Sequence, residues 1–277
     1  MTAEELIDIF VDTQQIIRSS PILYERSIKS QAASQLYLEG YHSPIREIKG
    51  NGTVRVVEKT TFQCAREQVA GTSRIAVLNF ANPHQPGGGV RRGAMAQEEC
   101  LCRSSDLYNV LAQPYFGKHY YEYHYRDCDF MFSDRLIYSP DVTVFKSDDT
   151  YPQLLEEPFF VDVITCAAPY INGSIIKTNE ELLDIYRSRI RNILEVAMAK
   201  DVDCLVLGAF GCGAFGNDPD LMARAFADLL IREHYAECFE KVVFAIKGNS
   251  GFNRNLASFE EAFYGISPEG NKRRFWM

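Results

Sequence analysis

Apolar residues recur with helical spacing at the start of the chain. A helix that Thr2 caps would carry on one face the residues Leu6, Ile9, Phe10, Thr13, Ile16 and Ile17. We expect this helix to end at Pro21, and a second, more polar helix to cover 27–38 before a turn at 40–44. These segments are too short to bury a core of their own. We therefore interpret residues 1–50 as an N-terminal helical extension of a main domain at 51–277.

From residue 53 onwards the pattern changes to short apolar runs separated by amphipathic segments. The runs do not alternate strictly, which is typical of strands buried on both faces; they cover 53–59, 74–80, 159–165, 205–209 and 242–246. Thr178 and Glu181 form a capping-box pattern, Asp218-Pro219 opens a further helix, and 254–264 has helical spacing. The order of elements predicts an α/β fold, a three-layer α/β/α sandwich around a central mixed sheet.

Composition narrows the class of protein. The 277 residues carry a net charge of −8, so a basic face for direct nucleic-acid binding is not expected. The eight cysteines show no CxxC pair and no zinc spacing with histidine, which predicts reduced thiols and no metal. The acidic start does not resemble a signal peptide, and no apolar run has the length of a membrane span. We expect an intracellular, cytoplasmic protein, or a nuclear one in a eukaryote.

The first candidate site follows the run at 74–80. Gly87-Gly88-Gly89 lacks every Cβ, so its backbone can take positive φ and approach a ligand closely. Gln97-Glu98-Glu99 follows at the expected start of a helix, and paired carboxylates supply acid–base and hydroxyl-binding groups. Taken singly, the three glycines are more simply explained as a flexible turn, and the two glutamates as compensation of a helix dipole. Their ordered combination behind a buried strand favours a hydrolase of a phosphate-bearing glycoside.

The second candidate site follows the run at 205–209. The glycine-rich segment 208–215 connects this strand to the helix opened by Asn217-Asp218-Pro219, and such a turn commonly binds anions through backbone N–H groups and the helix N-terminus. Its spacing is neither the GxGxxG dinucleotide fingerprint nor a Walker loop with its lysine. No histidine base is evident beside Cys212, so we interpret this cysteine as a small filler.

Together these motifs resemble a known family. Phe80-Ala81-Asn82, the triple glycine and the distance to Gln97-Glu98-Glu99 are similar to the signature of microbial-type poly(ADP-ribose) glycohydrolases. The segment 208–215 resembles the diphosphate-binding loop of that family, and the resemblance spans residues 50–263. It implies a catalytic macrodomain that hydrolyses ribose–ribose O-glycosidic bonds in poly(ADP-ribose) without a cofactor or a metal.

The resemblance also implies roles for individual residues. Glu99 would donate a proton to the departing ribose hydroxyl and then help to activate water, while Glu98 would hydrogen-bond the ribose hydroxyls. Asn82 would hold the terminal ribose, Phe215 would pack on ribose, and Gln97 would contact the adenine side or orient Glu98. The other expected substrate-binding residues shape the two loops: Gly87, Gly88, Gly89, Gly208, Phe210, Gly211, Cys212, Gly213 and Ala214.

The protonation of Glu99 is set by opposing effects. A helix N-terminus favours the ionised form of a carboxyl group, whereas the neighbouring Glu98 and an incoming diphosphate favour the protonated form. We therefore expect Glu99 to act as an acid mainly when substrate is bound.

Two other functions stay open. A non-catalytic ADP-ribose reader would use the same loops but would not need Gln97-Glu98-Glu99, and a mono-ADP-ribosyl-protein hydrolase would attack the same anomeric carbon. The expected partners are poly(ADP-ribose) or ADP-ribosylated proteins, with ADP-ribose as product. The chain lacks room for the long accessory domain of the larger animal enzymes, so we expect a pocket for a terminal unit and cleavage mainly from the chain end.

The segment 115–125 is unusually rich in tyrosine and contains two histidines. It would be an aromatic surface for adenine rings or a partner, or a half-buried cover over the sheet edge. We favour the cover, because tyrosine naturally spans an apolar and a wet side.

Overall fold

A mixed seven-stranded sheet forms the centre of the computed structural model, which describes residues 1–44, 46–71, 74–126, 130–171, 177–248 and 251–265. Its order is β1-β4-β5-β3-β6-β7-β2. The strands are β1 Gln35–Tyr37, β2 Val54–Val57, β3 Ile75–Phe80, β4 Leu136–Lys146, β5 Leu154–Cys166, β6 Cys204–Leu207 and β7 Lys241–Ala245. Neighbours from β5 to β2 run parallel, whereas β4 is antiparallel to both β5 and β1.

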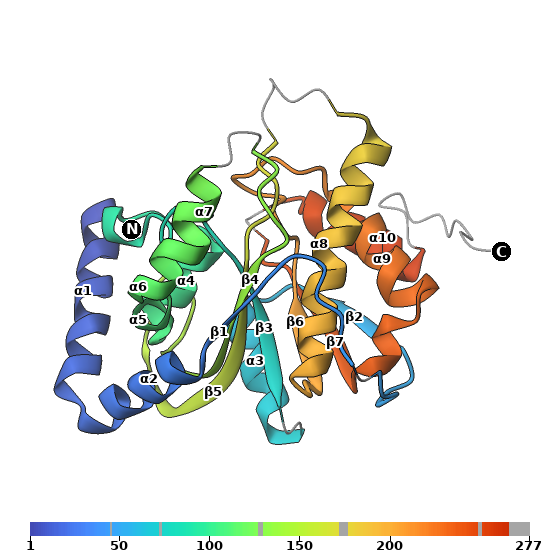
Figure 1. Cartoon of the computed structure of the whole chain (residues 1–277). Coiled ribbons are helices and arrows are strands. Elements are labelled where there is room, and N and C mark those ends of the chain that lie inside the picture. The colour runs from blue at the N-terminus through green and yellow to red at the C-terminus, as the bar shows by residue number, and fades with distance from the viewer. Residues whose placement is uncertain (45, 72–73, 127–129, 172–176, 249–250, 266–277) are drawn as a thin grey trace.

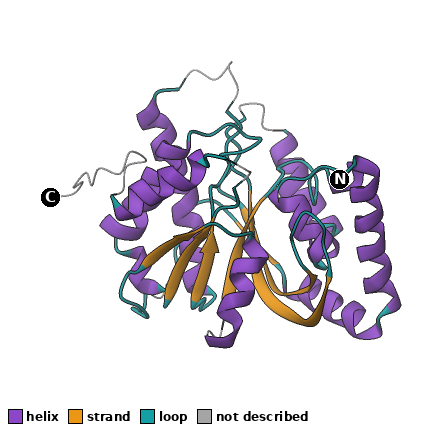
Figure 2. Cartoon of the chain, turned by 180° about the vertical axis from the view of Figure 1, so that it is seen from behind, coloured by secondary structure: helices purple, strands orange, loops and turns teal. Residues whose placement is uncertain are grey.

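Helices lie on both faces of this sheet, as Figures 1 and 2 show. They are α1 Ala3–Ser19, α2 Pro21–Ala33, α3 Thr61–Gln68, α4 Gln97–Ser104, α5 Leu107–Leu111, α6 Pro114–Phe116, α7 Glu122–Tyr125, α8 Asn179–Ala199, α9 Pro219–Ala227 and α10 Arg254–Tyr264. Short 3₁₀ or π turns complete them: η1 Val69–Gly71, η2 Val90–Arg92, η3 Gly117–Tyr121, η4 Asp228–Arg232 and η5 Tyr235–Cys238.

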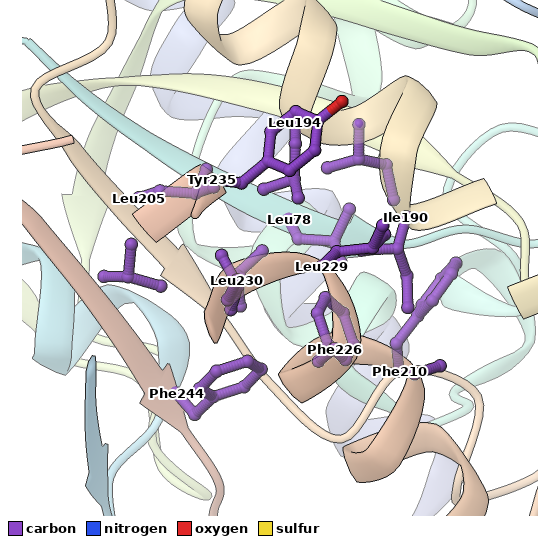
Figure 3. Packing of buried hydrophobic residues seen from close by; sticks show 14 of the residues in the cluster. Leu78, Ile190, Leu194, Leu205, Phe210, Phe226, Leu229, Leu230, Tyr235 and Phe244 are labelled. Carbon is purple, nitrogen blue, oxygen red and sulfur yellow. The ribbon is translucent and has the colours of Figure 1, made fainter. Parts of the chain in front are cut away.

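The two faces of the sheet bury separate apolar cores, because successive strand residues point to opposite sides. Leu78, Leu205 and Phe244 face a core that α8, α9 and α10 cover. In this core the rings of Phe226 and Phe244 meet edge to face at 5.0 Å, as Figure 3 shows beside Leu229 and Leu230. Burying each of these large side chains contributes about 1.5–3 kcal/mol to folding.

The opposite face is covered by α3, α4 and α5. Val77, Val163 and Val206 point into this second core, where they join Phe62 of α3 and Leu101 of α4. The sheet is therefore the middle layer of an α/β/α sandwich, which confirms the fold class predicted from the apolar runs.

The predicted strands agree with the structure, but the second helix does not. The helix expected at 27–38 begins at Pro21 and ends at Ala33, and its last predicted residues belong to β1. Ser20 caps α2 by accepting the N–H of Leu23, and a proline in the first turn removes no hydrogen bond that the helix needs. Pro21 therefore follows the end of α1 at Ser19, as predicted, and is also the first residue of α2.

The strand β4 was not predicted, because its apolar pattern is interrupted. Pro140 and Asp141 stand in the middle of the strand, where the register with β5 shifts between Ser139 and Val142. Asp141 has a φ of +53°, and its N–H donates to Asp162 at 2.9 Å. The interruption is a β-bulge, which accommodates a proline and a positive φ inside a strand.

The N-terminal helices lie against the same body as the sheet. In α1, Thr13 donates to the carbonyl of Arg103 in α4, and the Lys146 ammonium at the end of β4 lies 2.7 Å from Asp12. Ser30 of α2 donates to the Pro140 carbonyl in the bulge of β4. The division of the chain at residue 50 stays a prediction. No helix among the residues that the structure describes combines the length and apolar character needed to cross a membrane.

The tyrosine-rich segment forms α6, η3 and α7. Phe116, Tyr120 and Tyr121 are buried in the core beneath the second face, whereas Tyr115 and Tyr125 are exposed. This distribution supports the interpretation as a half-buried cover.

Candidate active site

The two predicted loops meet because their strands are neighbours. β3 and β6 pair in parallel, so their carboxyl ends reach the same edge of the sheet. Parallel sheets commonly bind ligands at this edge. The first loop, 81–96, leads from β3 to α4, and the second loop, 208–218, leads from β6 to α9.

Gln97 fixes the start of α4 against the end of β3. Pairing of β3 with β6 ends at Val77 and Val206, so the next backbone groups on that side of β3 need other partners. The Gln97 amide supplies them: its Oε1 accepts the N–H of Phe80 at 2.9 Å and its Nε2 donates to the carbonyl of Leu78 at 2.8 Å. Of the two roles expected for Gln97, this geometry favours orienting Glu98, the next residue.

Glu98 is almost completely buried, with 3% of its surface exposed. Its Oε2 accepts the N–H of Asn82 at 2.7 Å, and its Oε1 accepts from Asn79 at 3.3 Å. Burial raises the pKa of Glu98 to about 8, although these two donors act in the opposite direction. This shift favours the protonated form of Glu98, which would lower the negative charge of the site.

Glu99 is held by the glycine loop and by its own helix. Its Oε1 accepts the N–H of Gly89 at 2.7 Å, and its Oε2 accepts the N–H of Ala96 at 2.9 Å. Gly88 has a φ of +54°, and a Cβ there would lie 2.4 Å from Oε1 of Glu99. The glycines were expected to bring their N–H groups to ribose and diphosphate, but here those of Gly88 and Gly89 bond to Gln85 and Glu99. The loop therefore encloses the carboxylates.

Asn82 shapes the turn that carries the glycines. Its Oδ1 accepts the N–H groups of His84 and Gln85 at 2.9 and 3.1 Å, so only its Nδ2 lacks a hydrogen bond to the described residues. Its assignment to the terminal ribose stays a prediction.

Asn79 is a site residue that the sequence reasoning missed. Its fully buried side chain donates to Glu98 and, at 3.2 Å, to the hydroxyl of Thr165 in β5. Its Oδ1 has no partner among the described residues. The signal that could have found it was an asparagine within an otherwise apolar buried strand, since such a polar group needs a specific reason to be there.

The second loop presents unused backbone donors. The N–H groups of Gly211, Gly213, Ala214 and Phe215 make no hydrogen bond to any described residue. Gly211 has a φ of +72°, and a Cβ on this residue would lie 2.5 Å from Asn217, so only glycine fits there. Successive N–H groups that point outwards are a typical anion site.

The N-terminus of α9 does not share this role, contrary to our expectation. The Asp218 carboxylate caps the helix by accepting the N–H groups of Asp220 and Leu221. The diphosphate donors would therefore come from the loop itself.

One cavity of about 450 Å³ connects the two loops. Phe80, Ala81 and Gln97 line one side, and Gly211, Gly213, Ala214 and Phe215 line the other. Lys59, Lys247 and Asp148 also line the cavity, and the Lys59 ammonium is paired with the Glu67 carboxylate. The cavity has the size of a small-molecule site. Glu98 and Glu99 do not belong to this lining, because the glycine loop leaves only 3% and 6% of them exposed.

Three residues of the second loop support the cavity without lining it. Phe210 is 1% exposed and its ring lies 5.8 Å from that of Phe80. A Cβ on Gly208 would lie 2.7 Å from the Phe80 ring, so Gly208 allows this close approach. The side chain of Cys212 packs on the adjacent core, and burial raises the pKa of its thiol. That Gly208, Phe210 and Cys212 contact the substrate stays a prediction.

In the part of the chain that the structure describes, no three histidine, cysteine, aspartate or glutamate side chains gather as metal ligands. The absence of a metal from the reaction stays a prediction.

The sheet topology, with helices on both faces, defines a macrodomain-like fold. A buried pair of carboxyl groups follows β3, and a glycine-rich loop with N–H donors follows the neighbouring strand β6. Such a pair of carboxyl groups is of the type that glycosidases use as acid and base. The family model of the microbial-type PARG catalytic domain, that is of poly(ADP-ribose) glycohydrolase, matches residues 11–147. The chain belongs to the microbial-type poly(ADP-ribose) glycohydrolase family.

Solved structures agree over nearly the whole chain. The glycohydrolase from Thermomonospora curvata is 33% identical with a TM-score of 0.81, and the match covers 94% of this chain and 100% of that one. A structure of it bound to the inhibitor ADP-HPD is 34% identical at the same TM-score, with the same coverage. The Deinococcus radiodurans glycohydrolase in complex with ADP-ribose is 36% identical with a TM-score of 0.78, over 87% of this chain and 98% of that one. Comparison with curated proteins found no match.

Replacing Gly88 with alanine tests whether the loop must be glycine to enclose the carboxylates. The new Cβ would meet both Glu99 and Glu98 at a φ of +54°. We expect a loss of about 1–3 kcal/mol in the free energy of unfolding, measured by chemical denaturation. Gly117→Ala is the matched control, since that glycine has no atom within 4 Å of its Cβ position. Equal stabilities of the two variants would contradict the enclosing role of the loop.

The raised pKa of Glu98 predicts a pH-dependent stability. Between the ordinary value of 4.5 and about 8, the folded protein holds a proton that the unfolded chain has released. The free energy of unfolding should therefore fall as the pH rises through this window, by up to about 1.4 kcal/mol per pH unit. Glu98→Gln keeps the shape of the protonated acid and should remove this component.

Denaturation of both proteins across the window checks this prediction. Burial also raises the pKa of Asp106 to about 7, but Asp106 is present in both proteins, so the difference between their slopes isolates Glu98. Identical slopes would show that Glu98 is ionised in the folded protein.

Proposed function

We propose that this chain hydrolyses the ribose–ribose O-glycosidic bonds of poly(ADP-ribose), mainly from the chain end, and releases ADP-ribose. The observation that carries the proposal is the buried Glu98–Glu99 pair at the start of α4, beside a cavity that the free N–H groups of 211–215 close. The ADP-ribose and ADP-HPD complexes of the two bacterial relatives support it.

The second loop would bind the diphosphate. The N–H groups of Gly211, Gly213, Ala214 and Phe215, which have no partner among the described residues, suit an anion, and Lys247 adds charge to the same cavity. Phe215 would pack on ribose, and its ring is fixed in place by Tyr170 at 5.7 Å and Phe132 at 6.4 Å. A protein with a net charge of −8 would thus bind an anion through local donors.

The carboxylates would do the chemistry. Glu99 would donate its proton to the glycosidic oxygen as the bond to the anomeric carbon breaks and an oxocarbenium-like state develops. It would then accept a proton from the water that attacks the same carbon. Glu98 and the Nδ2 of Asn82 would hold ribose hydroxyls, with Asn79 and Gln97 as positioning residues that fix Glu98 and the start of α4.

Two other functions use the same fold. A reader of ADP-ribose would have no use for two carboxylates held by four N–H donors, because burying them is costly unless they are needed. A hydrolase of single ADP-ribose units on proteins would need the same groups. Incubation with poly(ADP-ribose) and separately with mono-ADP-ribosylated protein, followed by identification of the products, distinguishes the three.

Replacing Glu99 with glutamine removes the proton donor but keeps the side-chain shape. We expect turnover of poly(ADP-ribose) to fall at least about a hundredfold, with ADP-ribose binding nearly unchanged by calorimetry. Glu156→Gln makes the same chemical change at an exposed position of β5 and should retain full activity. A Glu99→Gln variant that kept most of its activity would exclude Glu99 as the acid.

The wall formed by Phe215 predicts where the enzyme cuts. A terminal ADP-ribose unit can enter the cavity fully and be desolvated, which strengthens its polar contacts, whereas an internal unit needs an exit for the chain beyond its adenosine ribose. We expect free ADP-ribose from the first minutes of digestion, while long polymers shorten gradually on gels. Early oligomers of middle length without free ADP-ribose would show internal cutting.

A further inference from the structure

A second, larger cavity lies behind the glycine loop. Its volume is about 790 Å³, and it is formed by one face of α1 from Ile7 to Ser19 and, opposite, by Arg91, Tyr108 and Asn109. We call it the α1 groove. In Figure 1, α1 stands at the outer edge of the molecule beside α4 and α5. Nothing in the catalytic scheme above uses this groove.

The groove and the carboxylate site share one loop. Arg91 is the second residue after Gly89, whose N–H holds Glu99. On the other side of the loop, a Cβ on Gly87 would lie 2.8 Å from the Tyr108 ring, so Tyr108 touches the loop and lines the groove. The glycine loop therefore contacts Glu99 with one residue and the wall of the groove with another.

The lining combines an apolar wall with positive charge. Phe10 and Tyr108 meet edge to face at 4.9 Å, and the Arg91 guanidinium lies 5.2 Å from the centre of the Tyr108 ring. Arg18 stands at the other end of the α1 face, and neither arginine has an acidic partner among the described residues. The Nε2 of Gln14 also lacks a hydrogen bond there.

The acidic residues of α1 do not line the α1 groove. The helix contains Glu4, Glu5, Asp8 and Asp12, yet none of the described residues that line the groove is acidic. In a protein of net charge −8, a wall with two arginines and no carboxylate is complementary to a polyanion. Aromatic rings and arginines are also the groups that bind a repeating chain of bases and phosphates.

We propose that the α1 groove binds a downstream ADP-ribose unit of the polymer whose terminal unit occupies the active site. Arg18 and Arg91 contact the diphosphate of that unit. This inference rests on the proposed function. It gives the enzyme a hold on the polymer that outlasts each cut, so that the shortened chain advances without dissociating.

The test compares two ligands of different length. The double variant Arg18→Glu/Arg91→Glu should bind free ADP-ribose as the wild type does, because a single unit in the active site leaves the groove empty. Its KM for long-chain poly(ADP-ribose) should rise about fivefold to tenfold, and the slope of log KM against log salt should fall by about 1 for each phosphate that the variant no longer neutralises. Arg66→Glu, an exposed residue of α3 outside both cavities, is the matched control.

Binding without turnover separates this proposal from the proposed function. In a Glu99→Gln background, the double variant should bind ADP-ribose like its parent but should bind long polymer more weakly, by fluorescence anisotropy. An unchanged polymer affinity, or an equal loss for ADP-ribose and polymer, would overturn the groove as a polymer site. A wild type that binds polymer through the groove but does not hydrolyse it would overturn the proposed function alone.

Discussion

The site depends on burying two adjacent carboxyl groups at the start of one helix. Removing a carboxylate from water is strongly unfavourable unless hydrogen bonds or a proton compensate it. Glu99 receives two backbone N–H groups, one from its own helix start and one from Gly89. Glu98 accepts N–H groups of Asn82 and Asn79, and its burial raises its pKa and so favours the protonated form. The loop between β3 and α4 is therefore shaped by what these two acids need.

The glycine loop packs closely against these carboxylates, in addition to offering its backbone to a ligand. Side chains at Gly87, Gly88 and Gly89 would meet Tyr108, Glu99 and Ala94 within 2.8 Å. The positive φ values of Gly87 and Gly88 turn the chain sharply enough to bring the Gly89 N–H to Glu99. The glycines thus allow acids to be held out of water next to the cavity, where a substrate would desolvate them further.

The sheet connects the glycine loop to the anion loop. Gln97 ties α4 to the end of β3, where β6 has diverged and left backbone groups unpaired. In the same place, the Phe80 ring occupies the space above Gly208 and meets Phe210. The two loops are therefore positioned by one strand end. The start of α4 and the second loop are thus placed beside each other by the pairing of β3 with β6.

The sequence by itself determined the sandwich, its parallel strands, most of its helix starts, the family and the two loops. These features depend on local chemistry, such as apolar runs, capping boxes and glycines. It did not determine β4, because a bulge at Pro140 and Asp141 interrupts the apolar pattern of that strand. It also did not determine the start of α2, because Ser20-Pro21 is equally typical of the end of a helix.

Only the tertiary structure decided which groups the site residues use. Asp218 caps α9 and so occupies the N–H groups at the N-terminus of that helix. The side-chain amide of Gln97 hydrogen-bonds to the backbone of β3, and the side chain of Asn79, within the sheet, hydrogen-bonds to Glu98. Each of these outcomes depends on a partner far along the chain or on competition for one N–H group. Spacing along a sequence cannot show which partner wins, because burial and distance are properties of the packed molecule.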